Sequence, residues 1–217
     1  MNKEISALRE SYTLSTLIRE DLASDPMDQF KAWFDNARSA EILEPNAMTL
    51  ATVNNDQLPS SRIVLLKEIE SDGIVFYTNY ESHKAQDISV NPNVCINFLW
   101  KEIQRQVRIE GIATKVSEAQ SLRYFQSRPK ASQIGAWVSA QSTVIQSRDI
   151  LEKAKVDLEL KYKNVDSLPL PPFWGGYKIT ATAYEFWQGR NSRLHDRFRY
   201  HKPDRTTASW KIDRLSS

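Results

Sequence analysis

Cationic or potentially cationic side chains occupy every second position from Arg193 through His195 to Arg197, near the end of the chain. In a β-strand these three side chains would share one face, because successive side chains alternate. At about 7 Å apart, each pair of like charges would cost roughly 2 kcal/mol at an effective dielectric of about 20. A phosphate would relieve that repulsion, since arginine pairs with phosphate oxygens and histidine donates in either protonation state. A solvated basic edge strand explains the same spacing equally well.

Other basic and polar side chains fall at predicted strand ends and helix starts, where proteins often bind ligands. Arg62 opens an apolar strand and Lys67 ends it. Strict alternation puts these two on opposite faces, so a shared ligand would require a bulge or a second subunit. Tyr77 and Thr78 end the next strand, and Ser82-His83-Lys84 lies at a helix N-terminus, which favours anions. For each position taken singly, a solvated surface residue is the more frequent explanation.

The composition is that of a globular protein without a strong field of either sign. The 217 residues include 29 Lys plus Arg and 27 Asp plus Glu, a formal net charge of +2. A nucleic-acid-binding β-barrel, which would usually be strongly basic, is therefore disfavoured. Cys95 is the single cysteine and there are three histidines, so we expect neither a disulfide nor a metal site. We find no signal peptide or membrane-spanning run, so the cytoplasm is the expected compartment.

The sequence contains several signals that predict where helices begin. Asp25-Pro26 predicts a helix start, because aspartate is a favoured N-cap and proline a favoured first residue. The apolar residues that follow it at one-face spacing are Phe30, Trp33, Phe34 and Ala37. Ser117 with Gln120 is a capping-box signature. Further helices are predicted over 82–90, 117–127 and 148–162. Residues 128–137 are predicted to form a turn, in which Trp137 packs in the core.

Short strands dominate the rest of the chain. The predicted strands are 48–53, 60–66, 73–78, 94–99, 104–114, 177–181 running toward Trp187, 193–200 and 209–215, the first two as a hairpin. The fold class is therefore mainly β with peripheral helices (α+β), a closed or partly closed antiparallel barrel with helices covering its ends. We expect residues 1–20 to be a mobile N-terminal arm and residues 21–217 to form a single domain.

Taken in order, eight segments of the chain resemble the pyridoxamine 5'-phosphate oxidase family. They are residues 62–67, 76–79, 127–129, 132–137, 141–142, 173–176, 186–189 and 193–197. Each segment alone is a weak signal, but together, with matching spacing, they are highly specific. The resemblance extends from about residue 9 to residue 215. It implies an antiparallel FMN-binding split β-barrel of Greek-key type, present as a homodimer with FMN at the subunit interface.

The resemblance also implies which residues bind the cofactor. The positions that match FMN ligands are Arg62, Ile63, Val64, Leu65, Leu66, Lys67, Tyr77, Thr78, His83, Lys84, Gln106, Gln141, Ser142, Trp187 and Arg197. Arg62 and Lys84 would hold the FMN phosphate. His83 stands where arginine is common in the family, which implies a weaker or more pH-sensitive grip on FMN. From the residues alone, a helix cap explains Gln141-Ser142 about as well.

The substrate positions follow from the same resemblance. They are Arg9, Tyr12, Lys67, Tyr124, Arg128, Ser132, Arg193 and His195. The first two belong to an arm that can cover the substrate, and the last two, placed over the pyridine ring, are the expected catalytic residues. Arg197 is assigned to flavin, so the three alternating cations need not grip one phosphate.

The implied reaction is FMN-dependent oxidation of pyridoxamine 5'-phosphate or pyridoxine 5'-phosphate to pyridoxal 5'-phosphate, in vitamin B6 biosynthesis and salvage. A hydride passes to flavin N5, and dioxygen is reduced to hydrogen peroxide. Two alternatives remain open. One is a flavin oxidase of the same fold that acts on another ring compound, as in phenazine biosynthesis. The other is a non-catalytic module that binds FMN or pyridoxal phosphate.

Overall fold

The computed structural model describes residue 7, residues 11–203 and residues 209–217, so that Arg9 lies outside the described residues. The chain divides into two compact units, and each is described by itself. The first unit comprises Met1–Thr49, Cys95–Gly111 and Ala181–Ser217. The second unit comprises Leu50–Val94 and Ile112–Thr180.

Nine strands of the described residues form a sheet with the order β2-β1-β5-β6-β7-β4-β3, and β8 pairs with β7 and with β9. The strands are β1 (Ala47–Val53), β2 (Pro59–Leu65), β3 (Glu68–Ile69), β4 (Gly73–Asn79), β5 (Asn93–Trp100), β6 (Arg105–Lys115), β7 (Trp174–Gln188), β8 (Asp196–His201) and β9 (Lys211–Leu215). The pairs β3–β4, β4–β7, β7–β8 and β8–β9 are antiparallel, as the sequence predicts. The sequence missed β3 and underestimated the length of β7.

The helices are η1 (Arg19–Asp21), α2 (Pro26–Ser39), α3 (His83–Val90), η2 (Lys101–Ile103), α4 (Glu118–Ser127), α5 (Lys130–Val138), α6 (Asp149–Lys161) and η3 (Asn191–Arg193). Of these, α2, α3, α4 and α6 begin within one residue of the starts that the sequence predicts, whereas α5 and the three short helices are not predicted. The Asp25 carboxylate accepts the Met27 N–H at 2.7 Å and caps α2. Ser117 Oγ accepts the Gln120 N–H at 3.2 Å and caps α4, while the Gln120 side chain donates elsewhere. Half of the predicted capping box is therefore present.

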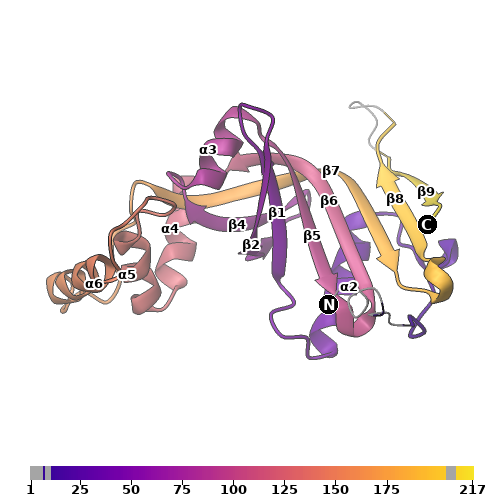
Figure 1. Ribbon diagram of the computed structural model, residues 1–217, viewed down its shortest axis with the longest axis horizontal. Helices are drawn as coiled ribbons and strands as arrows, with labels where there is room; N and C mark the ends of the chain where they lie inside the picture. The colour runs from indigo at the N-terminus through magenta and orange to yellow at the C-terminus, as the bar shows by residue number, and fades with distance from the viewer. Residues whose placement is uncertain (1–6, 8–10, 204–208) are drawn as a thin grey trace. The chain divides into compact units, whose positions relative to one another are not determined.

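In the second unit, an apolar cluster holds the helices that carry site residues. It consists of Phe125, Ile134, Ala136, Leu168 and Trp174. Phe125 lies on α4, the next two residues lie on α5, and Leu158 of α6 packs against the cluster. Figure 1 shows α4, α5 and α6 lying together. The cluster thereby fixes the ends of α4 and α5, where Tyr124, Arg128 and Ser132 occur.

Aromatic residues form the core of the first unit. Phe30 of α2 lies 5.1 Å from Phe98, and Trp33 lies 5.2 Å from Phe186, measured between ring centroids. All four side chains are at most 3% exposed. The apolar face predicted for this helix is therefore its buried face, and the packing adds roughly 0.5–1.5 kcal/mol per aromatic pair beyond area burial.

The prediction of a strand from residue 193 is wrong at its start. Arg193 ends the short helix η3, and β8 begins only at Asp196. Ser192 and Arg193 have left-handed φ angles of 57° and 61°. Because Arg193 and His195 precede the strand, the alternation that placed them on one face with Arg197 does not apply. A turn of this conformation usually carries glycine, and none stands at these positions to signal it.

The turn predicted over residues 128–137 is instead helix α5. Its inward face carries Gln133, which is only 2% exposed, beside Ile134 and Ala136. Gln133 donates to Arg128 O at 2.9 Å and accepts the Leu168 N–H at 2.8 Å. A buried glutamine interrupts the apolar periodicity by which helices are recognised, so the sequence pattern does not reveal this one. Trp137, predicted in the core, packs half-buried against the cluster around Phe125.

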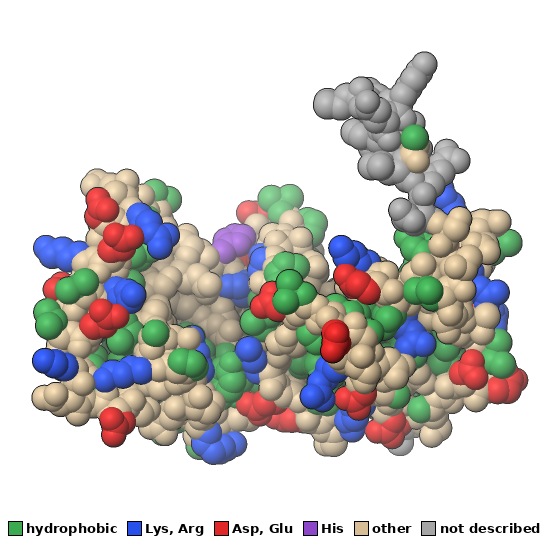
Figure 2. All heavy atoms as spheres, turned by 90° about the horizontal axis from the view of Figure 1, so that it is seen from below, with side chains coloured by type: hydrophobic (Ala, Val, Ile, Leu, Met, Phe, Trp, Pro, Cys, Tyr) green, Lys and Arg blue, Asp and Glu red, His purple; other side chains and the backbone are tan. Residues whose placement is uncertain are grey.

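The surface carries charges of both signs. Figure 2 shows Lys and Arg side chains interspersed with Asp and Glu over the face that it displays, in keeping with the net charge of +2. In the parts of the chain that the structure describes, no helix is long and apolar enough to span a membrane. Within the same residues, no group of three or more His, Cys, Asp or Glu side chains is placed to hold a metal ion.

We expect Ser117→Ala to lower the free energy of unfolding by about 1 kcal/mol, because α4 loses its cap. Urea titration measures this change. Ser89→Ala is the control, since the Ser89 hydroxyl donates to Gln86 O at an exposed helix end and caps no N-terminus. Equal destabilisation by the two substitutions would show that the cap of α4 is not a distinct source of stability.

Candidate functional site

A cavity of about 620 Å³ in the second unit gathers many of the predicted site residues. Residues of β2, β4, α3, α4, α5 and the start of β7 line it. The predicted residues on its wall are Ile63, Val64, Leu65, Lys67, Tyr77, Thr78, Lys84, Tyr124, Arg128, Ser132 and Gln141. Positions predicted for the cofactor and positions predicted for the substrate phosphate thus share one cavity.

Lys84 is a buried cation on the cavity wall. Its side chain comes from the first turn of α3, and the residue is 8% exposed. Nζ donates to Thr78 Oγ1, Ser82 Oγ and Gln141 Oε1, each at 3.2 Å. Burial, with the nearby charge of Arg62 as a second cause, lowers the pKa of Lys84 to about 8. Since these contacts are all neutral oxygens, the ammonium carries a penalty of roughly 3 kcal/mol that an anion would relieve.

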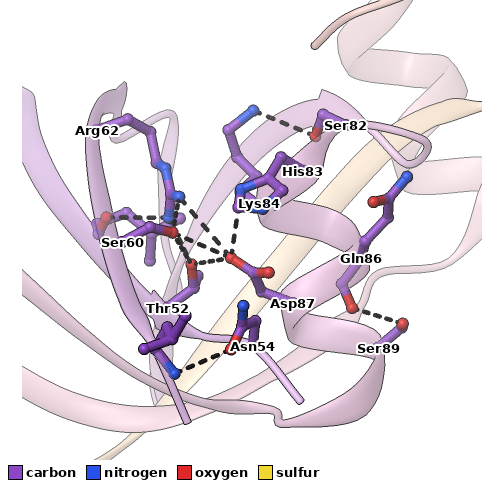
Figure 3. A network of polar contacts seen from close by, with 12 residues as sticks. Thr52, Asn54, Ser60, Arg62, Ser82, His83, Lys84, Gln86, Asp87 and Ser89 are labelled. Carbon is purple, nitrogen blue, oxygen red and sulfur yellow. Dashed lines mark hydrogen bonds and ion pairs between the residues drawn. The ribbon is translucent and has the colours of Figure 1, made fainter. Parts of the chain in front are cut away.

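A polar network lies beside Lys84 and is drawn in Figure 3. At its centre Asp87, 3% exposed, accepts hydrogen bonds from Thr52 Oγ1 at 2.6 Å and Ser60 Oγ at 3.1 Å. The Arg62 guanidinium donates to the same two hydroxyls and lies 3.8 Å from the Asp87 carboxylate. Burial lowers the pKa of Arg62, and Asp87 partly offsets that shift. His83 Nδ1 lies 3.8 Å from Asp87, with the ring 57% exposed. Asp87 therefore lies within ion-pair distance of both Arg62 and His83, two of the residues predicted to bind FMN.

Arg128 is a second cation on the cavity wall, and its side chain is partly buried. Its guanidinium carbon lies 4.8 Å from the Trp174 ring centroid and 5.8 Å from that of Phe125. Burial lowers the pKa of Arg128, and Tyr124 partly offsets the shift. Among the described residues, Nη1 of Arg128 is buried without a hydrogen-bond partner. A buried charged donor left unpaired costs at least about 1–3 kcal/mol, so this nitrogen is a ready contact for an anionic ligand.

Tyr77 and Tyr124 stack on the cavity wall, with ring centroids 3.9 Å apart. The Tyr77 hydroxyl donates to Glu68, whose other oxygen accepts from Gln120 Nε2 at 2.8 Å. Burial first, and then Glu68, raises the pKa of Tyr77. Sequence reasoning missed Glu68 and Gln120 as supports of this site. The capping motif singled out Gln120 for another role, and no pattern marked Glu68.

In the first unit, Trp187 and His195 lie close together, with ring centroids 4.5 Å apart. Tyr12 packs against both, at 5.8 Å from Trp187 and 5.7 Å from His195. Gly189 allows this approach, since an added Cβ would lie 2.8 Å from Tyr12 Cγ. Three residues predicted separately for the arm, the cofactor and the substrate are therefore neighbours.

His195 is held through one ring nitrogen. Nδ1 accepts the Arg190 backbone N–H at 3.1 Å. Burial, and then the charges of Arg193 and Arg197, lower the pKa of His195. His195 follows a strained turn, because left-handed conformations at Ser192 and Arg193 cost roughly 1–2 kcal/mol each.

Arg197 is fixed by a carboxylate that sequence reasoning missed. Its Nε and Nη2 both donate to Glu185 Oε1 at 2.8 Å, and Nη1 donates to Ser216 O at 2.8 Å. Glu185 is 4% exposed and also accepts from Arg108 Nη2 at 2.9 Å. The alternation of β7 does not reveal this glutamate, which lies buried between two buried aromatic neighbours. Gln106 lies half-buried on β6 of the same unit.

Some predicted residues lie off the wall of the large cavity. In the part of the chain that the structure describes, its lining does not include Arg62, His83, Leu66 or Ser142. Leu66 is 5% exposed, and Ser142 is exposed with a φ angle of 73°. The ligand roles of all the predicted positions stay predictions.

Two family models match the chain. Residues 34–161 match "Pyridoxamine 5'-phosphate oxidase", and residues 174–217 match "Pyridoxine 5'-phosphate oxidase C-terminal dimerisation region". A pyridoxine/pyridoxamine 5'-phosphate oxidase of Crocosphaera subtropica is 53% identical, over 98% of this chain and 99% of its own. A protein of the same name from Nostoc punctiforme is 50% identical over 100% of both chains.

Solved structures give the same result for the fold. PhzG from Burkholderia lata 383, in complex with tetrahydrophenazine-1-carboxylic acid, has a TM-score of 0.87, is 28% identical and matches 94% of this chain and 99% of its own. A pyridoxamine 5'-phosphate oxidase-related, FMN-binding protein from Nostoc punctiforme has a TM-score of 0.70 at 17% identity, over 90% of this chain and 100% of its own. The predicted split-barrel fold is confirmed. With a family model over residues 34–161 and relatives about half identical along nearly their whole length, this chain belongs to the pyridoxamine 5'-phosphate oxidase family.

Proposed function

We propose that this chain is an FMN-dependent cytoplasmic oxidase that converts pyridoxamine 5'-phosphate and pyridoxine 5'-phosphate into pyridoxal 5'-phosphate, with reduction of dioxygen to hydrogen peroxide. The observation that carries the proposal is a pair of cations on one cavity wall, of which Lys84 is buried and Arg128 is partly buried. Lys84 contacts neutral oxygens, and Arg128 Nη1 is buried with no hydrogen-bond partner among the residues that the structure describes. Two such cations favour two anionic groups, which the phosphates of the cofactor and the substrate would supply.

The residues present fit an FMN phosphate. Lys84 would hold it directly, and Arg62, kept in place by Asp87, would supply a second charge beside it. Thr78 and Gln141 already share hydrogen bonds with Lys84, so they would surround the same group. When bound, FMN supplies the two-electron acceptor that the oxidation requires.

The chain's own residues would bind and orient the substrate. Arg128, with Lys67, Ser132 and Tyr124 on the same wall, would anchor its phosphate. Binding energy from this remote group is then available for alignment of the reacting carbon. Arg193 would position that carbon, and His195 would assist by a hydrogen bond. The match of residues 174–217 to a dimerisation region supports a homodimer, with FMN at the interface between subunits.

The main alternative is oxidation of another ring compound on the same fold. The PhzG structure contains such a ring compound, but PhzG is 28% identical to this chain, whereas the relatives named as pyridoxine/pyridoxamine 5'-phosphate oxidases are about half identical. The deciding experiment records the visible spectrum of the purified protein and assays peroxide with each phosphorylated vitamer. A yellow protein that yields peroxide supports the proposal. A yellow protein that yields none would contradict the proposal and leave two alternatives, an oxidase of another ring compound and a non-catalytic module.

We expect the affinity for FMN to fall as the pH rises above about 8, where Lys84 of the free protein loses its proton. A bound phosphate favours the ammonium, so the dissociation constant should be flat below that pKa and rise by up to roughly tenfold per pH unit above it. Flavin fluorescence quenching measures this between about pH 7 and about pH 9. Lys84→Met should bind weakly with a flat profile, and Lys115→Met should keep the wild-type profile. A flat wild-type profile would exclude Lys84 as the phosphate ligand.

Arg193→Met is expected to lower turnover by at least about tenfold while the protein keeps its FMN, since alignment is lost but not the cofactor grip. Peroxide production at saturating substrate and the flavin absorbance of the purified protein measure the two effects. Arg38→Met, at an exposed position paired with Asp35, is the control and should leave both unchanged. Unaltered turnover of Arg193→Met would remove Arg193 from the reaction.

Arg128→Ala should raise the KM for pyridoxamine 5'-phosphate by roughly tenfold or more, with a smaller effect on kcat, because a charge-assisted contact to the phosphate is lost. Steady-state oxygen uptake gives both constants, and circular dichroism checks the fold. The control is Lys130→Ala, which removes a nearby positive charge that does not line the cavity. An unchanged KM for Arg128→Ala would mean that the phosphate binds elsewhere.

A further inference from the structure

The turn before β8 depends on its neighbours for its conformation. Ser192 and Arg193 are consecutive non-glycine residues with left-handed φ angles of 57° and 61°. Such a backbone persists only where surrounding contacts hold it, and it often occurs at functional sites. This turn carries Arg193 and leads directly to His195.

Two contacts of Arg190 close the turn. Its backbone N–H donates to His195 Nδ1 at 3.1 Å, and its side-chain Nη1 donates to Asp196 Oδ2 at 3.1 Å. Arg190 precedes η3 and Asp196 begins β8, so the two ends of the turn are joined by both bonds.

Asp196 is the meeting point of three separate segments. Besides Arg190, its carboxylate accepts the Leu17 N–H at 3.1 Å and Arg214 Nη1 at 2.9 Å. Burial alone would raise its pKa, but the Leu17 bond and the charges of Arg214 and Arg190 hold the pKa of Asp196 below its ordinary value. The carboxylate therefore stays ionised and ties the N-terminal segment, the turn and β9 together.

The Arg190 contact also determines which nitrogen of His195 carries the proton. A nitrogen that accepts a hydrogen bond has its lone pair free of a proton, so the neutral ring carries its proton on Nε2. The groups that face the ring are the aromatic Tyr12 and Trp187 and the charged Arg193 and Arg197. Held in this way, His195 offers an N–H donor rather than a base.

We propose that Asp196 is a positioning residue that, through Arg190, holds the turn so that His195 is kept as an Nε2–H donor beside Arg193. Its bond to Leu17 joins the N-terminal segment that carries Tyr12 to the same turn. The importance of this arrangement for turnover rests on the proposed function. The tautomer and orientation of the His195 ring do not depend on the proposed function.

The test is ¹⁵N NMR of histidine-labelled full-length protein with its bound flavin. The chain has three histidines, and His195→Gln identifies the signal of interest. In the wild type we expect the signature of the Nε2–H tautomer. Asp196→Ala should shift His195 toward exchange between the two tautomers. Arg190→Met, which removes only the partly exposed side chain and leaves the backbone N–H, should do the same to a smaller degree.

Asp213→Asn is the matched control. Asp213 lies in the same unit, pairs with Lys211 at 3.0 Å and lies 3.6 Å from His201 Nδ1. This substitution should alter the His201 signals and leave those of His195 unchanged. If Asp196→Ala and Arg190→Met both leave His195 as a single Nε2–H tautomer, Asp196 is not its positioning residue. A wild-type His195 protonated on Nδ1 would overturn the proposal at once.

Kinetics provide the second readout. Asp196→Ala and Arg190→Met should lower kcat roughly tenfold with flavin content unchanged, because alignment and not cofactor binding is affected. Unchanged kcat in both variants would contradict a role of Asp196 in turnover. A wild-type protein that oxidises neither phosphorylated vitamer would instead contradict the proposed function, while the tautomer measurement still decides the role of Asp196.

Discussion

A cation removed from water destabilises a folded protein unless an opposite charge or a full set of acceptors replaces the solvent. The cavity of the second unit contains two cations in this condition. Lys84 contacts neutral oxygens, and Arg128 lies over the Trp174 ring while its buried Nη1 has no partner in the described part of the chain. In a protein with 27 acidic residues, carboxylates were available to neutralise both. Their absence from these contacts is best explained if the missing negative charges belong to ligands.

Three other arginines differ from these two cations, because each lies beside a buried or partly buried carboxylate. Arg62 lies beside Asp87, Arg197 beside Glu185, and Arg190 beside Asp196. Removal of one such carboxylate would leave a charged guanidinium without its partner, which usually costs more than the pair contributes. The paired carboxylates therefore fix the orientation of their arginine side chains, whereas the two unpaired cations are available to bind anionic ligands. A site that must hold two phosphorylated molecules in register needs both kinds of residue.

The sequence predicted the elements whose signals are local. Asp25-Pro26 and Ser117 mark helix starts through their own backbone bonds, and alternation located most strands. Helix α5 was not predicted, because the polar residue Gln133 occupies its buried face. The turn at Ser192 was not predicted, because its left-handed backbone depends on contacts with segments that are distant in the sequence. The roles of Glu68 and Glu185 were not predicted for the same reason, because each contacts its site residue only when the strands are paired. The motifs thus identified the groups expected to touch ligands, and the fold added those that position them.

The residues expected to bind phosphate and those expected to contact the substrate ring lie in different units of the fold. The cations expected to face phosphate, Lys84 and Arg128, lie in the second unit, and the turn expected to face the ring, which Asp196 joins to Arg190, lies in the first. If the proposed roles hold, we expect changes in the turn to alter which ring is accepted and to leave the binding of phosphate unchanged. A TM-score of 0.87 with PhzG at only 28% identity shows how far sequences diverge on this backbone. We therefore expect the contacts around Asp196 and His195 to contribute to the choice of ring among such relatives.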